Sequence, residues 1–222
     1  MKINKSIFIA IIVLLVLCID QSLKIYIKTN FYLQQKESLF GLNWAYLNFI
    51  ENPGMAFGIE LGGKGGKYAL SIFRILAVFF IIYIIRGLIK SKASYGLLAC
   101  FGLILAGAIG NILDSMFYGL IFSVSSPHGA VAEFLPEGGG YAPFLQGKVV
   151  DMLYFPLVDT HLPDWLGGGR FRFFRPIFNI ADAAISTGVI SLLLFYRKFF
   201  LSSDEEKSKE ETETTSELFS EV

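Results

Sequence analysis

Cysteine and histidine are scarce in this chain of 222 residues. The two cysteines, Cys18 and Cys100, both fall inside apolar runs, so neither a disulfide framework nor a cysteine-based metal site is expected. His128 and His161 are the only histidines, which argues against a histidine-rich metal site. Ser-His-Asp and Cys-His catalysis also lack a suitable histidine. The sequence therefore predicts neither a metal nor a cofactor.

Charged residues are also few. They make up 17% of the chain, against 54% hydrophobic residues and a mean hydropathy of +0.56. A soluble domain would have about a quarter of its residues charged, so this composition indicates a membrane protein. The formal net charge is zero, and no basic field is present to attract nucleic acid.

Four apolar stretches have the length of a membrane-spanning helix, at about 7–27, 67–88, 95–122 and 177–196. The first has no small-residue cleavage site after it, so we interpret it as a helix and not as a removed signal peptide. Gly102, Ala106 and Gly110 give the third stretch a face small enough for close helix packing. The sequence thus predicts a mainly α-helical integral membrane domain over residues 1–201.

Basic residues recur at alternate ends of these stretches. They are Lys2, Lys5, Arg86, Lys90, Lys92, Arg197 and Lys198. By the positive-inside rule, both termini are cytoplasmic and the segments 30–66 and 123–175 lie on the other side of the membrane. Residues 202–222 form an acidic Ser/Thr/Lys tail, which we expect to be disordered in the cytoplasm.

The first extracytoplasmic segment has the pattern of a small β-sheet. Residues 31–35 and 45–50 alternate and carry aromatic and β-branched side chains, Asn52-Pro53-Gly54 is turn chemistry, and residues 62–66 are a glycine-rich hinge. The simplest interpretation of Asn48 and Asn52 is that they are turn residues.

The second extracytoplasmic segment is a long insertion rich in glycine, proline and aromatic residues. Its run 148–153 is apolar except for Asp151, which is consistent with a surface aspartate on a half-buried strand. The stretch 170–175 combines three arginines with three phenylalanines and has the composition of an interfacial aromatic belt.

The fourth apolar stretch begins with the polar residues Asn179 and Asp182. Pro176 suits a helix start and Asn179 is a good N-cap, a role for which Asp182 is not needed. An ionised carboxylate about one turn inside the membrane is costly and tends to be functional. Alternatively, Asp182 only interacts favourably with the positive end of the helix dipole. This stretch alone leaves both interpretations open.

The other spans also carry polar residues. Asp20 and Lys24 are four apart and can pair, either as a neutralised pair near the interface or as a polar face turned toward a site. Asn111 is most simply an interhelical hydrogen-bonding residue, and Asp114 a structural acceptor. Arg74 lies near one end of the second span, where it could extend its charge to the interface, so it need not be a site residue.

The predicted topology brings scattered polar residues to the outer interface: Asp20, Asn52, Asn111, Asp114, Asp151 and Asp182. A site of carboxylates and amides without a phosphate-binding loop restricts the chemistry. Two carboxylates that share a proton can hydrolyse a peptide bond. The ionised group takes a proton from water while the protonated group donates to the carbonyl or the leaving amine.

Five motifs occur in order along the chain: DQSLK at 20–24, ENPGMAFG at 51–58, GAIGNILD at 107–114, KVVDM at 148–152 and FNIADAAI at 178–185. Together they resemble the bacterial lipoprotein signal peptidases, the signal peptidase II family. The resemblance implies four transmembrane helices with an extracytoplasmic β-cradle, and a mobile flap over the site. It also implies intramembrane aspartyl proteolysis, which removes the signal peptide before the diacylglyceryl-cysteine of prolipoproteins and is inhibited by globomycin.

By the same resemblance, the catalytic residues are Asp151 and Asp182. The supporting or substrate-binding residues are Asp20, Lys24, Asn52, Gly54, Asn111, Asp114 and Asn179. Sequence spacing leaves open whether Asp114 or Asp151 partners Asp182. Ser115 departs from the arginine that many members carry after the aspartate, so a salt link there has to be replaced or lost. The insertions on either side of Asp151 are long.

We therefore expect a monomer in the bacterial inner membrane, with its site near the outer face, in contact with membrane lipid and with a diacylglyceryl prolipoprotein as substrate. The alternative is a proton-coupled transporter subunit that uses the same acids as a relay. The lack of an obvious internal repeat makes the transporter less attractive. A purely structural scaffold leaves the clustered acids unexplained.

Overall fold

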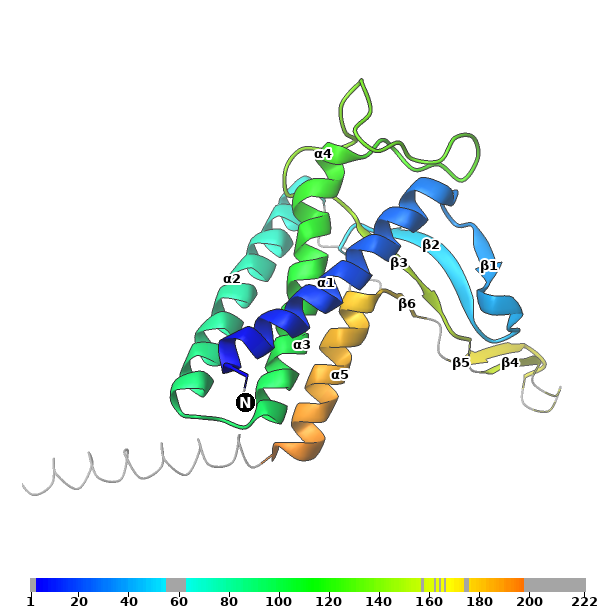
Figure 1. The fold of residues 1–222 in the computed structure, drawn as a ribbon. Helices are drawn as coiled ribbons and strands as arrows, with labels where there is room; N and C mark the ends of the chain where they lie inside the picture. The colour runs from blue at the N-terminus through cyan, green and yellow to red at the C-terminus, as the bar shows by residue number, and fades with distance from the viewer. Residues whose placement is uncertain are drawn as a thin grey trace, which may run out of the picture.

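The computed structural model describes residues 3–54, 63–156, 158–161, 163, 165, 167–173 and 176–197. Its helices and a small antiparallel sheet are arranged side by side (Figure 1). The predicted tail at 202–222 lies outside the described residues, as do Gly62 and Arg175. The mainly helical class with a small sheet is confirmed.

Within the described part of the chain, three helices are long and apolar enough to cross a membrane. They are α1 (Lys5–Asn30), α2 (Gly63–Lys90) and the continuous helical run 95–121. This run contains α3 (Tyr95–Leu113), a π-helical segment (Asp114–Tyr118) and the short α4 (Gly119–Ile121). The fourth, α5 (Ile180–Phe195), has 16 residues, or about 24 Å against the roughly 30 Å of a bilayer core. The count of four spans therefore stays a prediction.

The start of α5 differs from the sequence prediction. Ile177 and Phe178, expected in the helix, form strand β6 (Ile177–Phe178), and the helix begins at Ile180 after the N-cap Asn179. Pro176 is thus not the first helical residue. The cause is tertiary, because β6 pairs with strand β3 (Val149–Tyr154) and this pairing holds the two residues extended.

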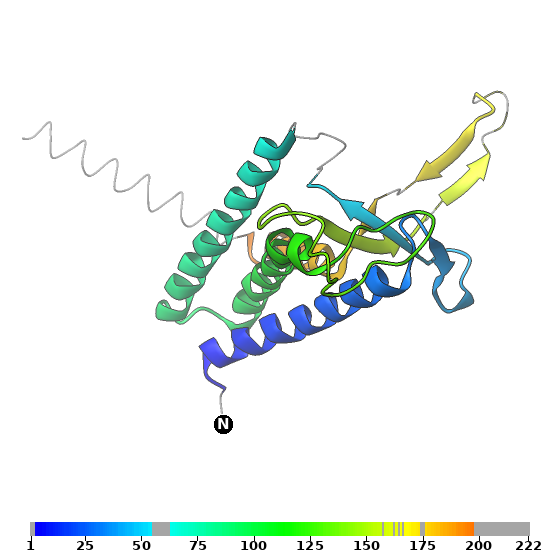
Figure 2. The same ribbon diagram turned by 90° about the horizontal axis from the view of Figure 1, so that it is seen from above.

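Helix α3 lies at the centre of the helices, with α1, α2 and α5 around it (Figure 2). Small residues allow the close approach of α5. A Cβ on Gly107 would lie 2.2 Å from the carbonyl oxygen of Ala181, and one on Gly188 would lie 2.7 Å from that of Cys100. At Gly110, from the predicted small face, a Cβ would lie 2.8 Å from the Asp20 carboxylate. The head of α5 and the middle of α1 are therefore held against α3.

The main sheet has the order β1-β2-β3-β6 and all its pairs are antiparallel. Its other strands are β1 (Lys36–Ser38), β2 (Tyr46–Asn52) and β3 (Val149–Tyr154). The expected strand at 31–35 is wrong: α1 continues to Asn30, Phe31 caps it, and Gln34 turns the chain with a φ of 68°. The expected strand at 45–50 corresponds to β2, and the expected strand around Asp151 is confirmed as β3.

The glycine-rich segment expected to be a hinge is helical where it is described, because α2 already starts at Gly63. A second, two-stranded sheet pairs β4 (Val158–His161) with β5 (Arg170–Phe173). It projects from the body of the protein (Figure 2). The interfacial role expected for residues 170–175 stays a prediction.

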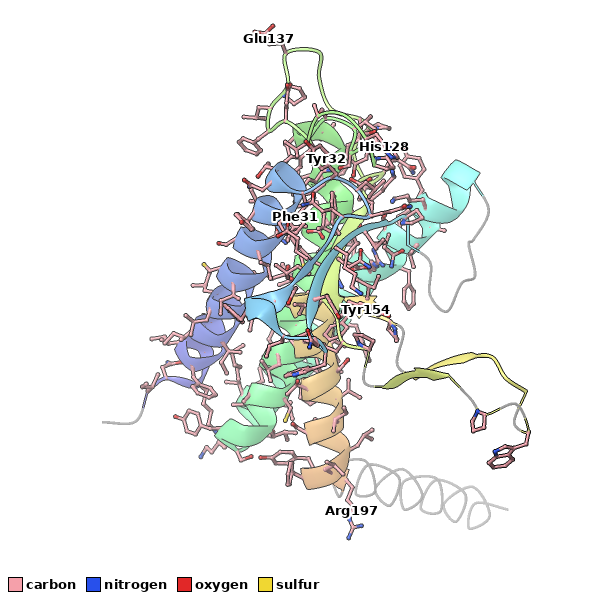
Figure 3. All side chains as sticks on the ribbon, turned by 90° about the vertical axis from the view of Figure 1, so that its right-hand side faces the viewer. Phe31, Tyr32, His128, Glu137, Tyr154 and Arg197 are labelled. Atoms are coloured by element: carbon pink, nitrogen blue, oxygen red, sulfur yellow. The ribbon has the colours of Figure 1, made fainter. Side chains whose placement is uncertain are left out.

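Different segments of the chain lie at the two ends of the helical body. The N-terminus, the α2–α3 connection and the end of α5 lie together at one end (Figure 1). Figure 3 places Arg197 at this end, and His128 and Glu137 of the first half of the insertion at the opposite end. Among the described basic residues, Lys5, Lys90, Lys92 and Arg197 belong to the segments at the end where the N-terminus lies, which agrees with the positive-inside prediction.

Candidate active site

The candidate site is built on the N-terminus of α5. The Asn179 side-chain oxygen accepts a hydrogen bond from the Asp182 N–H at 2.9 Å, and the Asn179 N–H donates to Asp182 Oδ2 at 3.4 Å. The predicted N-cap is therefore confirmed. The Asp182 side chain is not needed for the N-cap bond, as expected, but it adds a second one, because the two residues form a reciprocal capping box.

Asn179 also reaches the other predicted catalytic residue. Its side-chain amide donates to Asp151 Oδ1 at 2.7 Å, while its main-chain N–H donates to Asp182. One fully buried residue thus contacts both carboxylates. Because β3 and β6 are paired, Asp151 is brought to the first residue of the cap.

Asn111 on α3 fixes the other side of Asp182. Its Nδ2 donates to Asp182 Oδ1 at 2.7 Å, while its Oδ1 accepts from Lys24 Nζ at 3.0 Å and from Asn179 Nδ2 at 3.1 Å. The amide is therefore oriented by two donors at its oxygen and by one acceptor at its nitrogen. The interhelical hydrogen bond expected of Asn111 is confirmed, and its acceptor is the Asp182 carboxylate.

Asn52, the last residue of strand β2, contacts the site from the side of the sheet. It makes a side-chain hydrogen bond to Asp151, and its Oδ1 accepts from the Gly54 N–H at 2.8 Å. Gly54 has a φ of +107°, in a region that favours glycine. The turn role expected of Asn52 is thus correct, and the turn aims its amide at Asp151.

Behind these residues lies a buried ionic cluster. Lys24 Nζ is 2.9 Å from Asp20 Oδ2 and 2.9 Å from Asp114 Oδ2, and all three side chains are fully buried. Asp114 also accepts from the Val150 N–H at 3.3 Å, and Asp20 Oδ1 accepts from the Ala181 N–H at 2.9 Å. The cluster therefore ties α1 to the strand that bears Asp151 and to the helix that bears Asp182.

Asp114 and Asp151 differ in their hydrogen-bond partners. The oxygens of Asp114 accept from Lys24, Gln21 and a strand N–H, which makes it a structural acceptor, as one interpretation of the sequence held. Asp151 is the carboxylate that shares Asn179 with Asp182.

Arg74 takes part in the site, although the sequence interpretation did not require it. It is partly buried, and its Nη1 donates to Ser115 Oγ at 3.0 Å. The carboxylates of Asp182, Asp114 and Asp151 are all within electrostatic range of the guanidinium group. Arg74 of α2 thus hydrogen-bonds Ser115, the serine that stands where many members of the resembled family carry an arginine.

Burial sets the electrostatics of Asp151. The side chain is 4% exposed. Burial is the larger cause that raises the pKa of Asp151 from 3.8 to about 7, and the negative charge of Asp182 adds to it. The hydrogen bonds from Asn52 and Asn179 act in the opposite direction. Desolvation penalises the ionised form, and a like charge nearby adds to the penalty. At neutral pH this site can therefore hold both a proton and a charge, which general acid–base chemistry requires.

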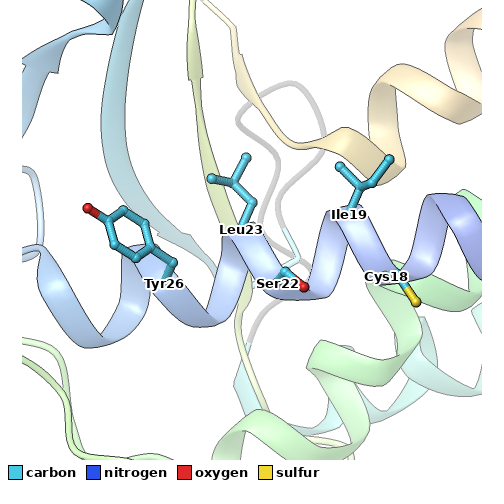
Figure 4. A pocket seen from close by; sticks show the side chains of 5 residues that line it. All are labelled: Cys18, Ile19, Ser22, Leu23 and Tyr26. Carbon is cyan, nitrogen blue, oxygen red and sulfur yellow. The ribbon is translucent and has the colours of Figure 1, made fainter.

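Asp182 is reached from an apolar groove along α5. The groove is about 320 Å³ in volume and is lined by Asp182 together with Phe178, Ala183 and Ile190. A larger hollow of about 560 Å³ on the outward face of α1 is lined by Cys18, Ile19, Ser22, Leu23 and Tyr26 (Figure 4). It contains none of the predicted site residues. Among the described residues, no group of three or more His, Cys, Asp or Glu side chains is placed to hold a metal ion.

Sequence comparison places this site in a family. The sequence model described as signal peptidase (SPase) II matches residues 12–199. The chain belongs to the signal peptidase II family. This family removes signal peptides from lipoproteins, so the chain is a peptidase with a prolipoprotein substrate, and the resemblance carried by the five motifs is confirmed.

Individual relatives agree with this assignment. The lipoprotein signal peptidase of Porphyromonas gingivalis is 48% identical over 192 residues, which cover 85% of this chain and 82% of the relative. That of Amoebophilus asiaticus is 41% identical over 188 residues, covering 82% and 75%. A bacterial membrane enzyme solved at 2.3 Å shares the fold, with a TM-score of 0.56 at 22% identity over 86% of this chain and 87% of the other. The chain is thus a membrane enzyme with several membrane-length apolar helices.

Several residues of the site were not predicted from the sequence. Gln21, inside the first motif, donates to Asp20 and to Asp114, each at 3.0 Å, and accepts from the Tyr118 hydroxyl at 3.2 Å. Lys28 pairs with Glu51 at the C-terminal end of α1. A signal for Lys28 was present, because it follows Asp20 and Lys24 at the same spacing of four and so lies on their helix face.

Proposed function

We propose that this signal peptidase II family member is an intramembrane aspartyl endopeptidase with Asp151 and Asp182 as its catalytic pair. It cleaves diacylglyceryl prolipoproteins directly before the lipid-modified cysteine. The observation that carries the proposal is the pair of hydrogen bonds from Asn179, one to each carboxylate, at the head of an apolar helix. This arrangement accounts for two acids close together where ionised groups are costly.

The reaction uses one proton shared by the pair. Burial favours that proton on Asp151, whose pKa is about 7, and leaves the negative charge on Asp182. Asp182 takes a proton from a water molecule, which attacks the scissile carbonyl, while Asp151 donates its proton to the carbonyl oxygen. The C–N bond of the tetrahedral intermediate then breaks as a carboxyl group of the pair protonates the leaving amine. Asn111, Asn52 and Asn179 keep both side chains in position throughout.

The proposed placement in the membrane follows from the helix ends. Both termini lie in the cytoplasm and the site is near the outer face of the bacterial inner membrane. In support, the N-terminus, the basic α2–α3 connection and the end of α5 lie together at one end of the molecule, while the main sheet lies beyond the N-terminus of α5 (Figure 1). Asp182 then lies in the outer part of the apolar groove, which is suited to the apolar part of a signal peptide.

The test is cleavage of a synthetic diacylglyceryl prolipoprotein peptide by purified protein in lipid bilayers. We expect Asp151→Asn and Asp182→Asn each to lower kcat by at least about 10³-fold while both proteins remain folded and membrane-inserted. Glu137→Gln, which removes a surface carboxylate far from the site, is the matched control and retains full activity. Normal processing by either aspartate variant would exclude this pair.

The same preparation tests the two alternatives left by the sequence. If Asp114 were the partner of Asp182, Asp114→Asn would abolish cleavage without loss of stability. We expect it instead to lower the unfolding temperature, because Lys24 loses one of its two carboxylates. A proton-coupled transporter would show pH-dependent flux and no cleaved product, and this outcome would overturn the peptidase mechanism.

A further inference from the structure

A second polar hollow, which we call the cationic pocket, adjoins the Asp151 side of the site. It has a volume of about 320 Å³, and its lining includes Glu51, Pro53, Lys67, Tyr141 and Lys148. None of these side chains takes part in the proposed chemistry. The pocket therefore calls for a separate physical explanation.

The only carboxylate among its described lining residues is already neutralised. Glu51 Oε1 pairs with Lys28 and accepts from Ser125 Oγ at 2.8 Å, and Glu51 Oε2 lies 2.9 Å from Lys148 Nζ. Burial opposes the charge of Glu51, but Lys28 and then Lys148 hold its pKa below the ordinary value. Glu51 is thus ionised, and it is shared by two ammonium groups.

The pocket consequently has a surplus of positive charge. Lys148 is 38% exposed and Lys67 is partly buried, so both can meet a ligand. Arg74, Lys148 and the already shared Glu51 lie within electrostatic range of Lys67, and no carboxylate among the described residues forms an ion pair with Lys67. Like charges gathered in a partly buried site repel one another, and an anionic ligand removes that cost.

The position of the pocket identifies the part of the substrate that reaches it. Glu51 and Pro53 flank Asn52, which hydrogen-bonds Asp151, and Lys148 directly precedes the strand that carries Asp151. Asp182, in contrast, lines the apolar groove. Arg74 is within electrostatic range of Lys67 and of both Asp151 and Asp182, so the cationic pocket lies near the two carboxylates. The two hollows share no lining residue, and a peptide bound at the carboxylates can therefore extend into each of them. The apolar hollow suits the signal peptide. The residues after the scissile bond are then left to occupy the cationic pocket.

We propose that the cationic pocket binds acidic side chains in the first residues that follow the lipid-modified cysteine, with Lys67 and Lys148 as their partners. This specificity rests on the proposed peptidase function. An anionic lipid headgroup carries the same charge, but the pocket is lined by the two neighbours of Asn52 and by the residue that precedes the Asp151 strand, which favours the peptide.

The experiment compares three diacylglyceryl prolipoprotein peptides that differ only in the residues after the modified cysteine, which carry Asp, Asn or Lys. Cleavage is measured in bilayers of zwitterionic lipid, so that no anionic headgroup competes. We expect kcat/KM for the Asp peptide to exceed that for the Asn peptide about fivefold to tenfold, and the Lys peptide to be the poorest. The preference should shrink at high salt, because the pocket is partly open to solvent.

Variants of Lys67 test the pocket itself. Lys67→Gln should bring the Asp-to-Asn ratio close to one, and Lys67→Glu should reverse the order so that the Lys peptide is preferred. A purely structural role of Lys67 would change all three peptides alike. Lys90→Gln removes the same charge from the opposite end of the same helix and leaves the ratio unchanged. If Lys67→Glu does not fold, the ratio in Lys67→Gln decides.

Each outcome distinguishes this inference from the proposed function. Cleavage of all three peptides at equal rates by the unmodified protein overturns the pocket specificity and leaves the peptidase intact. No cleavage of any peptide overturns the proposed function. If the Asp preference is absent and Lys67→Gln alters only the response to added phosphatidylglycerol vesicles, the pocket binds lipid and the peptide assignment is wrong.

Discussion

Replacing Asp151 by asparagine is expected to abolish cleavage and, above neutral pH, to stabilise the protein. Burial, together with the charge of Asp182, raises the pKa of Asp151 from 3.8 to about 7. A carboxyl group whose pKa is raised by folding contributes stability that is fully present below its unfolded pKa. That stability is lost as the pH rises through the folded pKa, here over the window from about 4 to about 7. Asparagine carries no charge and escapes this loss.

The magnitude follows from the same values. A rise from 3.8 to about 7 corresponds to about 4 kcal/mol at about 1.4 kcal/mol per pKa unit. Asparagine has one acceptor oxygen where the carboxylate has two, so either Asn52 or Asn179 loses its partner at a cost of about 1 kcal/mol. The variant should thus be about 1 kcal/mol less stable than the unmodified protein near pH 4 and about 3 kcal/mol more stable near pH 8. For a chain of this length the latter is roughly 10 °C in Tm.

The assay is thermal unfolding in detergent, followed by intrinsic fluorescence near pH 4, 6 and 8. Glu137→Gln serves as the control for loss of an exposed carboxylate, and its unfolding curve should follow that of the unmodified protein at every pH. A stability difference for Asp151→Asn that does not change with pH would refute the reasoning. So would a variant less stable than the unmodified protein near pH 8.

Three further predictions concern the surroundings of the pair. Arg74→Gln should lower kcat/KM by about tenfold and Arg74→Lys by less, because the guanidinium charge faces the carboxylates; an unchanged rate in Arg74→Gln would remove Arg74 from the site. Lys24→Met should lower the free energy of unfolding by about 3–5 kcal/mol, since it leaves two buried carboxylates unpaired. Denaturation that matches the unmodified protein would contradict the ionic cluster. Gly107→Ala should lower the unfolding temperature, because its Cβ would meet the Ala181 carbonyl oxygen at 2.2 Å, whereas Gly87→Ala, with nothing within 4 Å, should not.

Much of the helical architecture could be predicted from the sequence. Apolar runs fix the three long helices, since a helix in lipid satisfies its own backbone and needs only length and hydrophobicity. The cap at Asn179 was predictable for a similar reason, because it depends on residues within one turn of each other. The strand around Asp151 was also found, from its short apolar run bounded by polar residues.

The errors fell where distant segments decide the local structure. Ile177 and Phe178 are as apolar as the helix that follows, and only their pairing with β3 makes them a strand. Gly63 begins a helix although glycine disfavours one. Arg74 was interpreted from its position near a helix end, and its bond to Ser115 depends on how α2 packs against the π-helical segment.

The family, the membrane class and the small set of polar residues from which a site could be formed are readable in the amino-acid sequence, because these depend on composition and on short ordered motifs. The roles of the individual polar residues, in contrast, become distinct only in the fold. Asp114 and Asp151 are both single carboxylates in apolar surroundings, and nothing in their local sequence separates them. The fold does so, because Lys24 and the Val150 N–H bind Asp114, whereas Asn179 joins Asp151 to Asp182. Hydrogen bonds between residues far apart in the chain depend on the packing of whole elements, and a linear pattern does not contain that information.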